Sequence, residues 1–210
     1  MLTPEDVTKE GTLFALYRLS YKFPPNRFNQ IVATTIFLLL AVYCYLLWDN
    51  PSTLLFLFRK LVDIGLSFSS SILGFLVAGF TIYITVTNIV LFAEMAEKPY
   101  EDDHDESLFK YSLSAFMIAF AHYVSYLFTC IFSVLFLMQG GLLSSLYVEM
   151  SKIPCILPYM EFIRRMGIAV LLVCFGTWTA YLALVLKSFI FNIYAVVTIA
   201  VRTHMEEGSK

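Results

Sequence analysis

The sequence predicts an all-α, polytopic membrane protein with four transmembrane helices. Two runs contain no Asp, Glu, Lys or Arg: 30 residues from Ile64 to Ala93 and 38 residues from Tyr111 to Val148. A water-soluble helix needs a polar face, whereas about 20 apolar residues cross the hydrocarbon core of a bilayer. The composition agrees, because 59% of the 210 residues are hydrophobic, 14% are charged and the mean hydropathy is +0.76.

Residues 1–27 are predicted to form a cytoplasmic or interfacial helix that precedes the membrane domain. Thr3 suits an N-cap and Pro4 suits the first helical position, while Glu5 favours the positive end of the helix dipole. Pro24 and Pro25 would end this helix before the first span.

The four spans make up a membrane domain over residues 28–200. The first, about 28–48, ends in interface aromatics and is followed by a turn at 49–52 and a short amphipathic stretch at 54–63. The second, third and fourth spans are predicted at about 66–92, 112–138 and 166–186. The fourth has a helical extension to about 200, and residues 201–210 form a cytoplasmic tail.

The distribution of basic residues predicts the orientation. Four spans place both termini and the 93–111 loop on one side, where nine Lys and Arg residues lie, against five on the other side. The positive-inside rule then predicts cytoplasmic termini in a multi-pass protein of the cell inner membrane.

Signatures of enzymes are absent from the sequence. It contains no G-x-x-x-x-G-K-[ST], H-E-x-x-H, G-x-S-x-G or G-x-G-x-x-G motif, and its four cysteines form no C-x-x-C pair. We therefore expect no enzyme activity, no cofactor, no metal site and no direct contact with nucleic acid.

Small and weakly polar residues recur along one stripe of the second span, at alternating spacings of four and three. Such a stripe either lets two helices approach closely, or lines a water-filled path through an oligomer. We expect the chain to self-associate through the second span into a homo-oligomeric bundle. The stripe consists of Ser67, Ser71, Gly74, Ala78, Thr81, Thr85 and Asn88.

His122 is the one histidine well inside a predicted span. An ionisable group at that depth usually faces protein or a cavity and is often functional. It is either a neutral histidine hydrogen-bonded within the protein, or a gate, pH-sensitive group or pore ligand.

The 93–111 loop is strongly acidic. It is either a solvated linker or a docking site for a basic cytoplasmic partner, and an acidic ring at a pore mouth would favour cations. The candidate partner-binding residues are Glu101, Asp102, Asp103, Asp105 and Glu106.

The second span also carries a family resemblance. The run SSILGFLVAGFT at 70–81, followed by TVTN at 85–88 and a charged loop, resembles small four-helix bacterial membrane proteins of anti-phage defence operons. In size and layout the chain is similar to the Kiwa membrane component and the Hailong channel effector. The resemblance implies a homo-oligomer, such as a tetramer, with a cytoplasmic defence protein as partner or a cytoplasmic trigger. It also implies that Thr81, Thr85, Asn88 and His122 lie along the oligomer axis.

These observations lead to two functional hypotheses. The first is an oligomeric inner-membrane channel or membrane-perturbing effector that acts in a bacterial defence or stress response. The alternative is a non-conducting membrane sensor or anchor that recruits a cytoplasmic partner through its acidic loop and termini.

Overall fold

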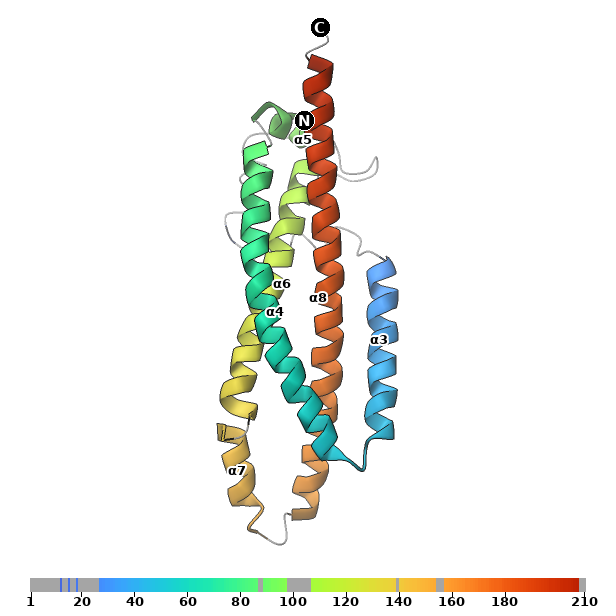
Figure 1. The fold of residues 1–210 in the computed structure, drawn as a ribbon, viewed down its shortest axis with the longest axis vertical. Coiled ribbons are helices and arrows are strands. Elements are labelled where there is room, and N and C mark those ends of the chain that lie inside the picture. Colours follow the sequence, from blue (N-terminus) through green and yellow to red (C-terminus); the bar gives the residue numbers. More distant parts are fainter. Residues whose placement is uncertain are drawn as a thin grey trace. The chain divides into compact units, whose positions relative to one another are not determined.

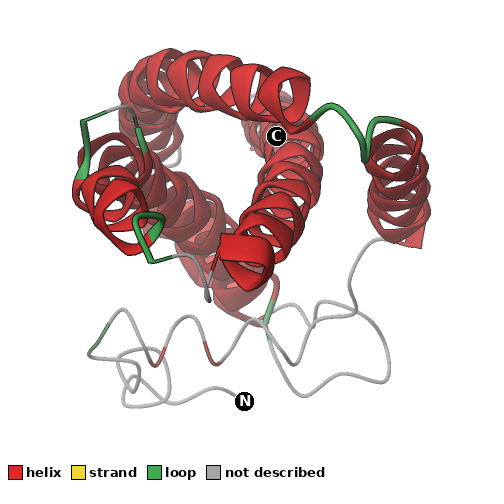
Figure 2. Cartoon of the chain, turned by 90° about the horizontal axis from the view of Figure 1, so that it is seen from below, coloured by secondary structure: helices red, strands yellow, loops and turns green. Residues whose placement is uncertain are grey.

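The computed structural model describes residues 27–86, 89–97, 107–138, 140–153 and 157–207, together with residues 12, 15 and 18. The helices and strands that the structure assigns in these ranges are all α-helices (Figures 1 and 2). Most of the predicted interfacial helix at 1–27 lies outside the described residues. In order, the helices are α3 (Arg27–Leu46), α4 (Pro51–Val86), α5 (Ile89–Glu97), α6 (Leu108–Leu137), α7 (Leu142–Met150) and α8 (Leu157–Glu207).

Four helical stretches are long and apolar enough to cross a membrane. They cover Arg27–Leu46, Pro51–Thr85, Leu108–Met150 and Tyr159–Thr198. Each overlaps one of the four spans expected from the sequence, so the prediction of an all-helical chain with four spanning helices is confirmed at this level.

Two of the helices are longer than the predicted spans. The stretch at 54–63 belongs to α4, which begins at Pro51. The last helix, α8, begins at Leu157 and continues into the predicted tail.

Asn50 explains the start of α4: its Oδ1 accepts hydrogen bonds from Ser52 Oγ (2.8 Å) and from the Thr53 backbone N–H (3.4 Å). Proline follows at the first helical position, where its missing N–H costs nothing.

The chain divides into two compact units. One contains Leu73–His122 and Leu184–Lys210 together with the N-terminal residues, and the other contains Asn26–Ile72 and Tyr123–Ala183. We call them the first and the second unit. Their boundaries fall within α4, α6 and α8, so each of these helices contributes a segment to each unit.

Tyr126 of α6 is the centre of the core of the second unit. Its ring is fully buried, and its centroid lies 5.7 Å from that of Phe175 and 5.3 Å from that of Trp178 on α8. Its hydroxyl lies 2.6 Å from Thr179 Oγ1. Gly65 of α4 faces the same ring and lets the two helices approach closely.

Phe116 of α6 is the centre of the core of the first unit. Its ring centroid lies 4.7 Å from that of Tyr83 on α4 and 4.8 Å from that of Phe189 on α8. Gly79 of α4 faces Phe189 as well, since a Cβ at this position would lie 3.1 Å from Phe189 Cζ. In both units, therefore, a glycine of α4 packs against a buried aromatic ring of another helix.

Candidate functional site

The predicted stripe on α4 lies on a face that the chain does not bury. All six of its described members are exposed, whereas Asn88 lies outside the described residues. The buried positions of α4 follow a different stripe, which includes Phe58, Ser69 and Tyr83. The helix therefore has one face for packing within the chain and another that carries the small residues. The exposed members are Ser67, Ser71, Gly74, Ala78, Thr81 and Thr85.

The exposed surface of α4 is wider than the stripe. Phe75, Val77, Ile82 and Ile84 are also exposed, each by about half of its surface. These are large apolar side chains, as expected of positions that face lipid. They supply matched control positions next to the stripe.

Gly74 marks the difference between the two faces. Beyond the adjoining backbone of α4, no described heavy atom lies within 4 Å of the position that a Cβ on Gly74 would take, whereas Gly65 and Gly79 each face an aromatic ring of the same chain. Two of the glycines of α4 thus serve packing within the chain, and Gly74 serves none.

Three hydroxyls of the stripe are bonded within their own helix. Thr81 Oγ1 donates to the Val77 carbonyl (3.0 Å), Thr85 Oγ1 to the Thr81 carbonyl (2.7 Å) and Ser71 Oγ to the Ser67 carbonyl (2.9 Å). A hydroxyl whose proton is used in this way can face a bilayer without an unsatisfied donor. Its oxygen still has lone pairs that can accept a hydrogen bond from water or from another helix.

His122 lies on α6 and is half-buried. Its neighbours along the helix, Ala119, Tyr123 and Tyr126, are buried. Ser125, one turn further along, is exposed, so His122 lies at the edge of the buried face of α6. The five candidate partner-binding acids, Glu101, Asp102, Asp103, Asp105 and Glu106, lie outside the described residues.

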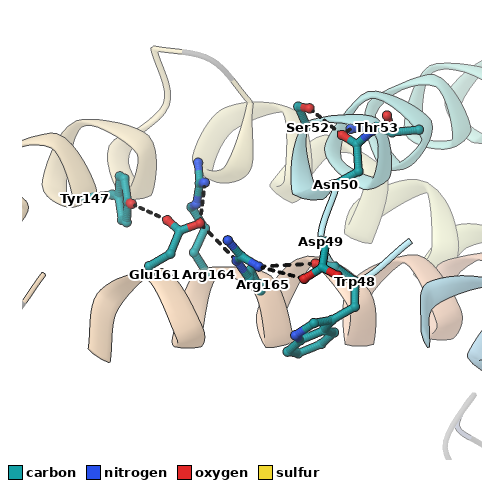
Figure 3. A network of polar contacts seen from close by, with 9 residues as sticks. All are labelled: Trp48, Asp49, Asn50, Ser52, Thr53, Tyr147, Glu161, Arg164 and Arg165. Atoms are coloured by element: carbon teal, nitrogen blue, oxygen red, sulfur yellow. Dashed lines mark hydrogen bonds and ion pairs between the residues drawn. The ribbon is translucent and has the colours of Figure 1, made fainter. Parts of the chain in front are cut away.

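A polar network in the second unit was not foreseen as a site (Figure 3). Glu161 of α8 accepts hydrogen bonds from three side chains. Arg164 Nη2 (2.9 Å) and Arg165 Nε (3.1 Å) donate to its Oε1, and Tyr147 Oη of α7 (3.2 Å) donates to its Oε2. The Arg164 guanidinium also lies 5.3 Å from the centre of the Tyr147 ring, in a cation–π arrangement.

Arg165 connects this network to the turn between α3 and α4. Its Nη1 lies 3.7 Å from Asp49 Oδ1 and donates a hydrogen bond of 3.5 Å to the Trp48 carbonyl (Figure 3). The contact joins two connecting segments, 49–63 and 139–165, that are predicted from the sequence to lie on the same side of the membrane. The spacing of Glu161, Arg164 and Arg165 already predicts pairing on one helix, but it gives no sign of the partners at positions 49 and 147.

Among the residues that the structure describes, no group of three or more His, Cys, Asp or Glu side chains could hold a metal ion. The described cysteines, Cys44, Cys130 and Cys174, carry free thiols.

The chain was also compared with known proteins. No family model matches it, and no curated protein and no solved structure is similar to it.

Proposed function

We propose that this chain self-associates in the membrane through the exposed stripe on α4, and that the assembly acts as a channel or membrane-perturbing effector. One observation carries the proposal: the six described residues of the stripe are exposed, and Gly74 contacts no other described helix. In lipid, helices associate where small residues let their backbones approach closely, and Gly74 and Ala78 provide such a position.

The hydroxyl oxygens of Thr81 and Thr85 are the groups that conduction would use. Their protons are bonded within α4, and each oxygen keeps lone pairs that can accept a hydrogen bond. Around the axis of an oligomer they would offer water or a cation a row of oxygen ligands between apolar neighbours. In the closed state, apolar side chains would keep this path dry. A cytoplasmic signal would open it by binding the open state more tightly than the closed one.

The family resemblance supports a place for this assembly in the inner membrane, in a bacterial defence response. Opening would depolarise the cell. The proposed orientation, with both termini in the cytoplasm, follows from the excess of basic residues on that side.

Replacing Thr85 with leucine tests whether the stripe on α4 lines a water-filled path for conduction. Leucine removes the acceptor oxygen and adds an apolar side chain, so we expect the current across a planar bilayer to fall to a small fraction of that of the unchanged protein. Ile84→Leu is the matched control, because Ile84 is exposed about 100° further round the same helix. It should conduct normally.

Two outcomes would contradict the proposal. Equal currents from the Thr85→Leu and Ile84→Leu variants would remove the stripe from the conduction path. Absence of any current, combined with copurification of a soluble partner, would favour the alternative of a non-conducting membrane anchor.

A further inference from the structure

An apolar groove runs between α3 and α8 in the second unit. It has a volume of about 380 Å³. The helix α3 is loosely held, since only Asn29 and Cys44 of its residues are buried. The contact with α8 includes Leu40, which lies against Gly176. The groove walls come from Phe37, Ala41 and Cys44 on α3 and from Ala169, Val170 and Val173 on α8.

The groove extends over most of the depth of one leaflet of a bilayer. Its helical walls run from Phe37 to Tyr45 on α3 and from Met166 to Cys174 on α8, which corresponds to about 12 Å at the helical rise of 1.5 Å per residue. Half of the hydrocarbon core is about 15 Å thick. Tyr45 and Trp48 lie at the end of this stretch, and such side chains are enriched at the level of lipid headgroups.

One end of the groove carries a pair of opposite charges. Trp48 and Met166 line the groove, and the next residues along the chain, Asp49 and Arg165, form the ion pair described above. The Asp49 side chain is fully exposed, and that of Arg165 is 29% exposed. Neither residue lines the groove, but both charged groups are exposed next to the groove residues Trp48 and Met166.

From this arrangement we propose that the groove binds one phospholipid whose zwitterionic headgroup carries a primary amine, as in phosphatidylethanolamine. An acyl chain would occupy the apolar groove, the phosphate would accept hydrogen bonds from the Arg165 guanidinium, and the ammonium group would donate to the Asp49 carboxylate. Charge complementarity selects this headgroup. A choline headgroup has no N–H donor for Asp49, and an anionic headgroup offers that carboxylate no positive charge.

Quenching of Trp48 fluorescence by lipids with brominated acyl chains tests the proposal. The chain has two tryptophans, so a Trp178→Phe background isolates the signal of Trp48 and keeps an aromatic ring next to Tyr126. The full chain is reconstituted in bilayers that contain brominated phosphatidylethanolamine, phosphatidylcholine or phosphatidylglycerol at the same mole fraction. We expect phosphatidylethanolamine to bind about two- to fivefold more tightly than the other two lipids, the range that one exposed charge pair supports.

Matched variants separate the headgroup site from the groove. Asp49→Asn should abolish the preference for phosphatidylethanolamine, and Asp63→Asn, at another exposed acid of the same unit, should keep it. Ala41→Phe fills the groove and should lower quenching by all three lipids. Leu38→Phe, at an exposed position of α3 that does not line the groove, should leave quenching unchanged.

Native mass spectrometry of the chain with both tryptophans intact repeats the comparison by counting bound lipids, with and without Asp49→Asn. Equal binding of the three lipids would overturn the proposal, because the groove would then hold only bulk lipid. A preference that survives Asp49→Asn would also overturn it. Weak quenching of Trp48 by every lipid would overturn it as well, because protein, such as a second copy, would then fill the groove.

Discussion

Replacing Gly65 with alanine is expected to destabilise the second unit by about 1–3 kcal/mol, the usual cost of forcing extra volume into a packed core. A Cβ at this position would lie 2.5 Å from Tyr126 Oη and 2.9 Å from Tyr126 Cε1. The tyrosine cannot easily move away, because its ring is fully buried against Phe175 and Trp178 and its hydroxyl is bonded to Thr179. The thermal unfolding midpoint in detergent, followed by circular dichroism, measures the effect.

Gly167→Ala is the matched control for this change. Gly167 also lies on a helix of the second unit, but no heavy atom lies within 4 Å of the position that a Cβ would take there, and the residue is exposed. Alanine there should raise stability by up to about 1 kcal/mol, since it favours the helix over glycine. If the Gly65→Ala protein were as stable as the Gly167→Ala protein, this result would contradict the close packing of α4 against Tyr126.

Replacing Glu161 with glutamine should destabilise the second unit by about 1–2 kcal/mol. The carboxylate accepts three hydrogen bonds and is the shared counter-charge of Arg164 and Arg165. Hydrogen bonds to charged groups contribute about 1.5–3 kcal/mol each, but the Glu161 side chain is 33% exposed, so water screens a large part of this. The midpoint of unfolding in the same detergent assay measures the loss.

Glu149→Gln supplies the comparison. Glu149 pairs with Lys152 at 2.7 Å, but their side chains are 69% and 63% exposed, so this pair contributes no more than about 0.5 kcal/mol. An equal effect of the two replacements would contradict the structural role given to the Glu161 network.

The long uncharged runs were enough to predict four helices that can span a membrane, but they did not give the ends of those helices. The sequence predicted a second span from about residue 66 and a separate amphipathic stretch at 54–63, which contains Arg59, Lys60 and Asp63. A helix can continue through such a stretch, as α4 does from Pro51. The start of α4 is better indicated by Asn50 and Pro51, because Asn50 caps the helix and proline is favoured at the first helical position.

The six described residues of the predicted stripe lie at exposed positions of α4, but the helical period could not say what that face contacts. Glycine permits close approach to a helix of the same chain as readily as to one of another chain. Gly65 and Gly79 face rings of their own chain, whereas Gly74 faces open space, and their sequence surroundings do not distinguish them. The partners of Arg165 could not be predicted from the sequence either, because a contact between positions 49 and 165 depends on how α3 and α8 pack.

Self-association through the stripe on α4 is tested most directly by cysteine cross-linking in membranes. With the four native cysteines replaced by alanine, a single cysteine is introduced at Ala78 on the stripe or at Val77, which is exposed about 100° away on the same helix. A disulfide forms only where two Cβ atoms approach to about 4 Å. Mild oxidation should therefore convert the Ala78→Cys chain to covalent dimers and leave the Val77→Cys chain monomeric. Equal cross-linking at both positions, or cross-linking at Val77 alone, would contradict the proposed interface.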